Sequence, residues 1–424
     1  MAAIETDILP PSDIPLAAWL TRAGLDGCSV DSMMAEFSER LNRDAGIPVE
    51  RVYLAMTTLH PLLRARGYTW AAGQGLVDVA AMPHRDVGDE PPAWQESPFR
   101  HMLVKWETEM RRRLVGPQAR HDFPVLRDFA DQGFADWIAF AHSFGWDLSI
   151  AQRQVGYDAG MGMICSFATR HPDGFSASEI DRLRVLVSLL ALTVKAVTLT
   201  QLARDVTAAY VGRDAASHVL SGEIRRGMAQ KIDAVILYAD LRGFTQVADR
   251  LAIEPLIEML NAYFDCLGPA IEENGGQVLK FLGDGLLASF QLAPGQDPAP
   301  LCAAALAAAE QSLAAVEKLN AARRGEGVPT LELDIALHRG TVMYGNVGTS
   351  ARLDFTLIGP AVNEAARLEN LCATLDRNLI ASRSFVISAG GAARRLRSLG
   401  SHSLRGVAEP QEVFTPVASG SGGR

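Results

Sequence analysis

The segments AVILYADLRGFT at residues 234–245 and GGQVLKFLGDGLLASF at residues 275–290 carry the strongest structural pattern in this chain. The first segment begins with a short apolar run that is typical of a buried strand. In the second segment, two apolar runs flank Leu-Gly-Asp-Gly, which predicts a β-hairpin. Asp240 ends the strand, and Asp284 lies at the hairpin turn. If these strands are neighbours in one sheet, the two carboxylates meet in space.

The rest of this half alternates helices and strands. A helix is predicted at residues 254–273 because apolar residues recur at spacings of three and four, and two glycines follow it. The later elements are predicted as helices at 303–320 and 363–371 and strands at 331–338 and 412–417. The resulting order, strand–helix–strand–strand–helix–strand, predicts an α+β sandwich of the ferredoxin-like kind.

Two converging carboxylates with few His or Cys residues nearby favour one type of chemistry. Hard cations such as Mg²⁺ and Mn²⁺ prefer oxygen ligands. A pair of such ions binds phosphate-bearing substrates, activates an attacking oxygen and stabilises a leaving one. The spacing alone leaves a structural alternative open, in which Asp240 caps the next helix and Asp284 only fills a turn.

Three sequence blocks in this half carry a resemblance to a known family. The blocks DLRGFT at 240–245, GGQVLKFLGDG at 275–285 and DFTLIGPAVNEAARLE at 354–369 resemble the signature blocks of the class III nucleotidyl cyclase catalytic domain. They occur in the family's order and at family-like distances. The resemblance covers about half of the chain and predicts a catalytic domain at residues 231–417.

The resemblance implies a metal site and a phosphate site. Asp240 and Asp284 match the family's two metal-binding aspartates, and the backbone carbonyl of Leu241 matches a third ligand. Two Mg²⁺ or Mn²⁺ ions per site would lower the pKa of the ribose 3′-hydroxyl and hold the triphosphate. Backbone amides around Gly243, including those of Phe244 and Thr245, would contact the phosphates.

The resemblance also implies a choice of base. Lys280 and Thr356 stand where adenine-selecting cyclases carry Lys and Asp or Thr. Lysine can donate to adenine N1, whereas guanine has an N–H at that position and guanylate cyclases usually carry Glu there. The pair therefore predicts ATP. A structural alternative exists for each residue, since Lys280 fits the solvent face of a strand and Thr356 fits an ordinary strand position.

Three further residues match transition-state and phosphate positions of the family. Asn363 and Arg367 match the pair that orients the ribose and stabilises charge on the α-phosphate, and they lie four residues apart on one helix face. Arg405 stands where the family usually has a Lys that binds the terminal phosphates, so the charge is kept. In the structural alternative, Arg367 pairs with Glu364 or Glu369 on the surface.

The site of this family is shared between two chains, so a single cyclase domain with every role filled implies a homodimer. The predicted function is an adenylate cyclase that makes cyclic AMP and pyrophosphate from ATP. The alternatives are a catalytically silent nucleotide-binding regulator, a guanylate cyclase and a diguanylate cyclase. The sequence GDGLL at residues 283–287 lacks the GG(D/E)EF loop of diguanylate cyclases, which counts against the last.

The N-terminal half is of another kind, because it holds all six tryptophans, within residues 1–146. We predict a mostly helical region at 1–100 and a mixed α/β sensory region at 101–205, which resembles a GAF domain over residues 121–202 and would take a small-molecule ligand. Ser176 and Glu179 form a predicted capping box that opens a helix to about residue 205. The predicted remainder comprises a helical linker at 206–230 and a disordered tail at 418–424.

Composition narrows the remaining function classes. The 424 residues are 48% hydrophobic and 21% charged, with a net charge of −9, so no nucleic-acid partner is expected. The apolar stretch at 183–203 is long enough for a membrane span, but it contains Arg184 and Lys195, and a buried or dimerising helix is favoured. Five widely spaced cysteines, and a start without a secretory signal, predict a cytoplasmic protein.

Overall fold

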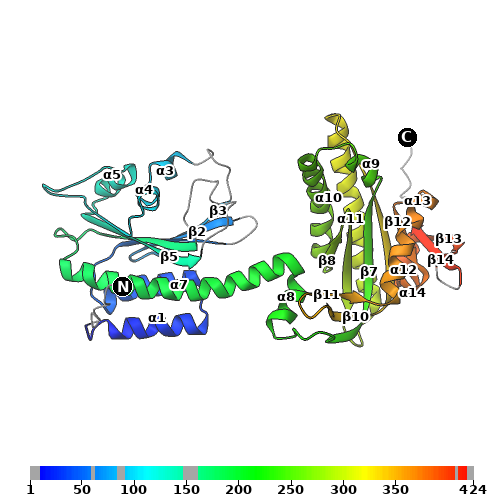
Figure 1. Cartoon of the computed structure of the whole chain (residues 1–424), viewed down its shortest axis with the longest axis horizontal. Coiled ribbons are helices and arrows are strands. Elements are labelled where there is room, and N and C mark those ends of the chain that lie inside the picture. Colours follow the sequence, from blue (N-terminus) through cyan, green and yellow to red (C-terminus); the bar gives the residue numbers. More distant parts are fainter. Residues whose placement is uncertain (1–9, 59–62, 84–90, 147–160, 406–408, 418–424) are drawn as a thin grey trace. The chain divides into compact units, whose positions relative to one another are not determined.

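The computed structural model describes residues 10–58, 63–83, 91–146, 161–405 and 409–417. The chain divides into two compact units, Met1–Val206 and Thr207–Arg424 (Figure 1). The predicted disordered tail at 418–424 lies outside the described residues.

The N-terminal unit is built on a six-stranded antiparallel sheet with the order β3-β2-β1-β6-β5-β4. Its strands are β1 Arg51–Thr57, β2 Leu63–Ala71, β3 Gly75–Pro83, β4 Glu109–Arg113, β5 Asp136–Trp146 and β6 Met161–Thr169. Its helices are α1 Ile14–Asp26, α2 Val30–Arg43, α3 Pro92–Gln95, α4 Pro98–Lys105, α5 Pro124–Asp131 and the long α7 Ala177–Val211.

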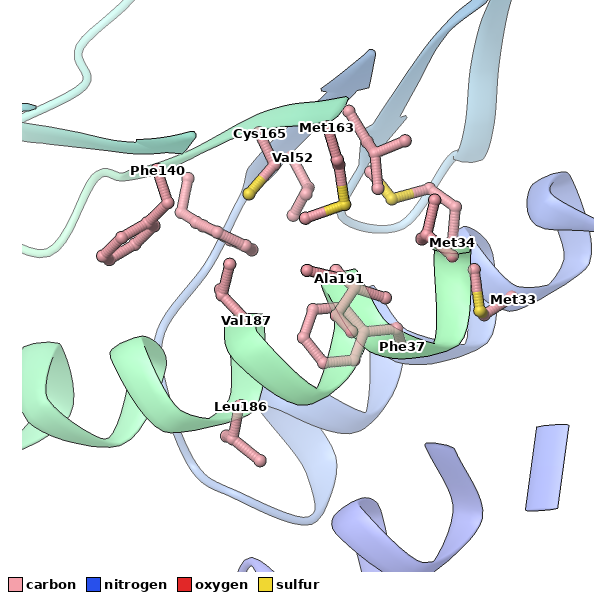
Figure 2. Close-up of a cluster of buried hydrophobic side chains, with 14 of the residues drawn as sticks. Met33, Met34, Phe37, Val52, Phe140, Met163, Cys165, Leu186, Val187 and Ala191 are labelled. Atoms are coloured by element: carbon pink, nitrogen blue, oxygen red, sulfur yellow. The ribbon is translucent and has the colours of Figure 1, made fainter. Parts of the chain in front are cut away.

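Both faces of this sheet are buried, and the alternation of side chains along β5 shows it. Ile138 and Phe140 join an apolar cluster with α1, α2 and α7, part of which is drawn in Figure 2. Trp137 and Ala139 point to the opposite face and join a second cluster with α4 and α5. Successive strand residues point to opposite faces, so one strand supplies both cores.

The predicted mostly helical region at 1–100 is wrong where strands β1 to β3 lie, between residues 51 and 83. Three strands, β1 to β3, follow the two helices. The signal was a period of two along β1, where Val52, Leu54 and Met56 are buried and their neighbours are half-buried. The mixed α/β class of the sensory region is confirmed, while the resemblance to a GAF domain stays a prediction.

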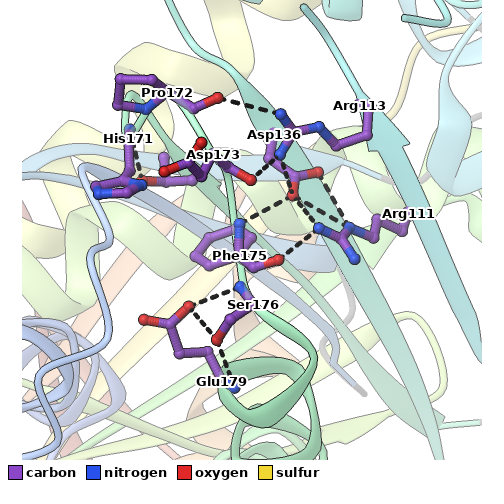
Figure 3. A network of polar contacts seen from close by, with 10 residues as sticks. Arg111, Arg113, Asp136, His171, Pro172, Asp173, Phe175, Ser176 and Glu179 are labelled. Carbon is purple, nitrogen blue, oxygen red and sulfur yellow. Dashed lines mark hydrogen bonds and ion pairs between the residues drawn. The ribbon is translucent and has the colours of Figure 1, made fainter. Parts of the chain in front are cut away.

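The start of α7 has the predicted capping box. The Ser176 backbone N–H donates to the Glu179 carboxylate at 2.7 Å, and the Glu179 N–H donates to the Ser176 Oγ at 3.3 Å (Figure 3). The residue before this box is tied to the sheet, because the Phe175 N–H donates to the buried Asp136 carboxylate at 3.0 Å. The helix continues past the predicted end near residue 205, to Val211.

The C-terminal unit is built on an eight-stranded sheet. Its strands follow the order β13-β14-β12-β10-β7-β9-β8, and β11 pairs with β10. The strands are β7 Ala229–Arg242, β8 Gln277–Leu282, β9 Gly285–Leu292, β10 Glu332–Gly348, β11 Leu353–Ile358, β12 Leu379–Ser382, β13 Leu396–His402 and β14 Gln411–Pro416. The helices are α8 Arg213–Leu220, α9 Phe244–Ala248, α10 Ile253–Glu273, α11 Pro298–Gly325, α12 Pro360–Glu369, α13 Leu371–Leu375, α14 Arg383–Ser388 and the 3₁₀ turn η1 Gly390–Arg395.

The predicted ferredoxin-like arrangement is present at the centre of this sheet. Strands β10, β7, β9 and β8 lie side by side in that order, and the three pairs that they form with one another are antiparallel. Helices α10 and α11 cover one face with a large apolar cluster. Helices α8 and α12 contribute to a smaller cluster that includes Ile236 and Leu287, two residues of the other face. The long β7–β10 pair thus carries the residues that build the site.

Two helices in the described part of the chain are long and apolar enough to cross a membrane by length and composition, α7 and α11. Each contributes many residues to an apolar cluster of its own unit. In α11 the buried residues include Cys302, Ala305 and Leu306. The apolar character of both helices is therefore explained by packing within the protein.

Candidate active site

The end of β7 and the β8–β9 hairpin bring Asp240 and Asp284 together. The hairpin turn is Gly283-Asp284, between the paired residues Leu282 and Gly285. Gly283 has a φ of +73°, which a two-residue hairpin turn of type II′ requires at its first central position. A Cβ on Gly285 would lie 2.8 Å from the Oδ1 of Asp240, so the hairpin packs directly against that carboxylate.

The charge around Asp240 is unbalanced. Burial, and in second place the charge of Asp284, raise the pKa of Asp240 to about 6. In the described residues neither Asp240 nor Asp284 takes part in an ion pair, although each is only partly exposed. Two carboxylates held together without a cationic side chain are a donor set that suits a hard divalent cation.

Two more carboxylates lie in this neighbourhood, and sequence reasoning did not single out either as part of the site. Asp334 of β10 stands opposite Asp240 in the sheet register and is neutralised by Arg242, whose Nε donates to Oδ2 at 2.8 Å. Glu369 ends α12 and is buried. Its burial, and then the charges of Asp240 and Asp334, raise its pKa to about 7. Glu369 lies within the quoted block 354–369, but the sequence did not show that it is buried.

The structure contains no group of three or more His, Cys, Asp or Glu side chains that could hold a metal ion in the part of the chain it describes. The predicted ligand set would not form such a group, because it consists of two carboxylates and one backbone carbonyl, that of Leu241. Leu241 follows Asp240 in β7 and its side chain is buried. The charge excess around Asp240 is the feature that fits a cation here.

The predicted phosphate-binding backbone opens a short helix. Gly243 has a φ of +84° and is the N-cap of α9. Phe244 packs its ring against the core under α10 and α11, and Thr245 is exposed. The turn places the amides of these residues directly after β7, and thus close in sequence to Asp240.

The two predicted base-selecting residues come from different strands, and a third residue, Asp354, connects them. Lys280 of β8 forms an ion pair with Asp354 of β11. Thr356 lies two residues further along β11, so it shares a face of that strand with Asp354. Sequence reasoning missed Asp354, although it opens the third quoted block. The Lys280 side chain is 33% exposed and pairs with Asp354, whose side chain is 55% exposed.

The remaining predicted residues are exposed or half-buried. Asn363 is exposed and Arg367 is half-buried on α12, a helix that packs against β10 and β7. Arg367 makes no ion pair within the described residues, and Glu364 contacts His338 at 3.6 Å instead. The surface pairing of Arg367 is therefore absent there. Arg405 is exposed after β13, and the residues that follow it lie outside the described part.

Comparison with known proteins supports a cyclase domain. Residues 228–406 match the family model described as the adenylate and guanylate cyclase catalytic domain. An adenylate cyclase of Anabaena cylindrica is 35% identical over 164 residues, which cover 38% of this chain and 32% of that protein. Adenylate cyclase 1 of Rhizobium meliloti is 27% identical over 199 residues, which cover 46% of this chain and 29% of that protein. The chain thus spans about a third of the length of these curated relatives.

Solved structures of cyclases of both specificities are similar to part of this chain. The adenylyl cyclase CyaB from P. aeruginosa has 25% sequence identity and a TM-score of 0.41, covering 45% of this chain and 97% of that one. The guanylyl cyclase Cya2 has 25% identity and a TM-score of 0.39, covering 46% and 97%. The family-model match by itself places a catalytic domain of the adenylate and guanylate cyclase family in the C-terminal unit, and this class generally uses divalent metal ions.

Proposed function

We propose that this protein is an adenylate cyclase that converts ATP to 3′,5′-cyclic AMP and pyrophosphate. In this reaction the ribose 3′-oxygen forms a bond to the α-phosphorus and its proton is lost to solvent. The bond between the α-phosphorus and the pyrophosphate oxygen breaks. The observation that carries the proposal is the ion pair between Lys280 and Asp354. Asp354 lies two residues before Thr356 in β11, so the pair brings Lys280 to the strand that carries Thr356.

Asp240, Asp284 and the carbonyl of Leu241 would hold two Mg²⁺ or Mn²⁺ ions. When bound, the ions would lower the pKa of the 3′-hydroxyl and neutralise charge on the pyrophosphate. The partly buried position of Asp240 keeps its carboxylate in a medium where its attraction to a cation is stronger than in water. The amides of Phe244 and Thr245 would hold the phosphates, and Arg405 would contact the terminal ones.

Adenine selection follows from the chemistry of Lys280. An ammonium group has three donors and no acceptor, so it can serve the acceptor N1 of adenine but not the N1–H of guanine. The ion pair with Asp354 limits the positions of the flexible Lys280 side chain. Thr356 has a hydroxyl that both donates and accepts, so it suits the adjacent edge of the base.

Asn363 and Arg367 would orient the ribose and stabilise charge on the α-phosphate. We propose that they act on nucleotide bound to the metal ligands of a partner subunit, in a homodimer with two equivalent sites. A mixture of variants tests this arrangement. Asp240→Ala and Arg367→Ala should each be inactive as homodimers, and mixing them should restore one working site of two. No recovery in the mixture would contradict the shared site.

The N-terminal unit is proposed to regulate the enzyme as a sensory module for a small-molecule ligand, in the cytoplasm. The five cysteines are all free. Free thiols agree with a reducing compartment, and the cytoplasm supplies ATP.

The decisive experiment is a nucleotide and metal panel on the purified full chain. ATP or GTP is added with Mg²⁺ or Mn²⁺, and cyclic nucleotide and pyrophosphate are quantified. Equal amounts of cyclic AMP and pyrophosphate are expected, with no product when the metal is chelated. A GTP rate above the ATP rate would establish a guanylate cyclase. Nucleotide binding without either product would establish a silent regulator.

A further inference from the structure

The short helix α8 forms part of the packing of the catalytic unit. It begins after Gly212, the single residue that separates it from the end of α7. Ala215 and Ala216 are buried, with 1% and 3% of their surfaces exposed. Ala215 belongs to the apolar cluster that contains Tyr344 and Phe355. Such small side chains allow a helix to approach its neighbours closely, so α8 is fixed to this part of the sheet.

His218 is the residue through which α8 contacts β11. Its ring lies flat on the ring of Phe355, with centroids 5.3 Å apart and an interplanar angle of 17°. It also meets Tyr344 edge to face, at 6.1 Å and 87°. Phe355 and Tyr344 are themselves 4.7 Å apart at 85°. The three rings form one aromatic cluster, and aromatic pairs of this geometry contribute beyond the area they bury.

Polar contacts hold the His218 ring in this orientation. Nδ1 lies 3.0 Å from Oε2 of Glu223, and Nε2 lies 3.8 Å from Oδ2 of Asp214. Asp214 and Glu223 come from the two ends of the same segment. Glu223 is tied to the sheet in turn, because the Asn346 side chain donates to its carbonyl at 2.5 Å. The ring is therefore held by a hydrogen bond at Nδ1 as well as at its face.

Phe355, on which the His218 ring stacks, stands between Asp354 and Thr356 in β11. The Phe355 ring points into the cluster with α8. The side chains of Asp354 and Thr356, its neighbours in the strand, therefore point to the opposite face of the sheet. The same helix reaches the other strand as well. A Cβ on Gly212 would lie 3.2 Å from the carbonyl of Val278, two residues before Lys280. Helix α8 thus touches neighbours of both proposed base-selecting residues.

We propose that His218 is a positioning residue for nucleotide selection, which sets the place of β11, and hence of Asp354 and Thr356, by stacking on Phe355. This inference rests on the proposed role of Lys280 and Thr356 in binding adenine. It gives a direct route from the end of the N-terminal unit to the base, since α8 follows α7 after one residue. A displacement of this helix would change the selection and affinity of nucleotide without touching the metal ligands.

The test compares three variants of the full chain. His218→Ala removes the stack, His218→Phe keeps an aromatic face but loses both polar contacts, and Ser217→Ala changes an exposed neighbour on the same helix. For each variant, kcat and KM are measured with ATP and GTP, and Tm is recorded. His218→Ala should raise the KM for ATP and lower the ATP-to-GTP ratio of kcat/KM by about tenfold. His218→Phe should restore most of that ratio, and Ser217→Ala should match the wild type.

Two results would overturn the inference. One is a His218→Ala variant with a lower Tm and kcat but an unchanged KM and ATP-to-GTP ratio, which would show a structural role only. The other is an equal loss of selectivity in His218→Phe and His218→Ala, which would exclude stacking. If the wild type makes no cyclic nucleotide, the proposed function fails by itself. Displacement of a fluorescent ATP analogue by ATP and by GTP then decides whether His218 sets nucleotide preference.

Discussion

Each unit holds one aspartate of special interest, Asp136, which is buried, and Asp240, which is half-buried, and the two carboxylates differ in their charged neighbours. Asp136 of the N-terminal unit is fully buried, and Arg111 donates to it from Nη2 at 2.5 Å and from Nε at 3.1 Å (Figure 3). Arg113 and the Phe175 N–H add further contacts. Asp240 of the catalytic unit has a carboxylate, Asp284, as its charged neighbour instead.

This difference supports the proposal that Asp136 has a structural role and that Asp240 binds metal. The buried Asp136 carboxylate has its charge and hydrogen-bonding needs met by groups of the same chain. Through these contacts it connects β4, β5 and the start of α7. A buried carboxylate whose neighbours carry the same charge is costly in the free protein. A bound cation would relieve that cost, which is why the proposed metal site is placed at Asp240.

The largest expected effect is on catalysis at Asp240. Substituting a residue that only hydrogen-bonds to a metal ligand typically costs up to about 100-fold, so loss of a proposed direct ligand in Asp240→Asn should cost more than about 100-fold in kcat/KM for ATP. Because the substitution also removes an unfavourable charge, the Tm of the metal-free protein should stay equal or rise. Steady-state kinetics with Mn²⁺ and calorimetry on the same preparation measure both quantities.

Asp249→Asn is the matched control for this variant. Asp249 is exposed, nine residues further along the chain, and forms no ion pair in the described residues. Its activity should equal that of the wild type. An active Asp240→Asn variant would remove the distinction between the two aspartates.

The second effect is on stability at Asp136. Asp136→Asn leaves two arginines without their counter-charge, and the free energy of unfolding of the N-terminal unit should fall by about 3 kcal/mol. All six tryptophans lie in residues 1–146, so urea unfolding followed by tryptophan fluorescence reports this unit selectively. The control is Asp122→Asn, which breaks an ion pair with Arg112 where the Asp122 side chain is 43% exposed, and should cost less than about 1 kcal/mol. Equal losses in the two variants would show that burial of Asp136 does not matter.

The contrast between the units also shows what could be read from the sequence. The strand ending at Asp240 and the hairpin carrying Asp284 were predictable because each consists of local signals, an apolar run and a Gly-Asp turn. Glu369, Asp354 and His218 were not singled out, because their importance arises from contacts between residues far apart in the chain. In the N-terminal unit, β1 was missed because its alternation covers only seven residues.

A third and smaller effect concerns pH and metal binding at Asp240. Its pKa is raised from 3.8 to about 6, so the folded protein holds this proton to a higher pH than the unfolded chain does. The metal-free catalytic unit therefore loses stability from this group as the pH rises between these values. Mn²⁺ binds the ionised form, so the rise in Tm on adding Mn²⁺ should be larger at about pH 7.5 than at about pH 5.

Calorimetry of the full chain at both pH values measures this difference. Asp240→Asn should reduce the Mn²⁺-induced rise in Tm at the higher pH. A rise in Tm that is independent of both the pH and the substitution would mean that Mn²⁺ binds elsewhere.

The smallest effect tests whether the start of α7 is as firmly held as the complete network around Asp136 suggests. Ser176→Ala removes the hydroxyl that accepts a hydrogen bond from the Glu179 backbone N–H. The free energy of unfolding of the N-terminal unit should fall by about 1 kcal/mol, again measured by tryptophan fluorescence. Ser188→Ala is the control, because Ser188 is exposed within the same helix and Ala is the better helix former there. If Ser176→Ala costs as much as Asp136→Asn, the cap and the buried carboxylate act as one unit. If it costs about 1 kcal/mol, Asp136 anchors the helix independently of the cap.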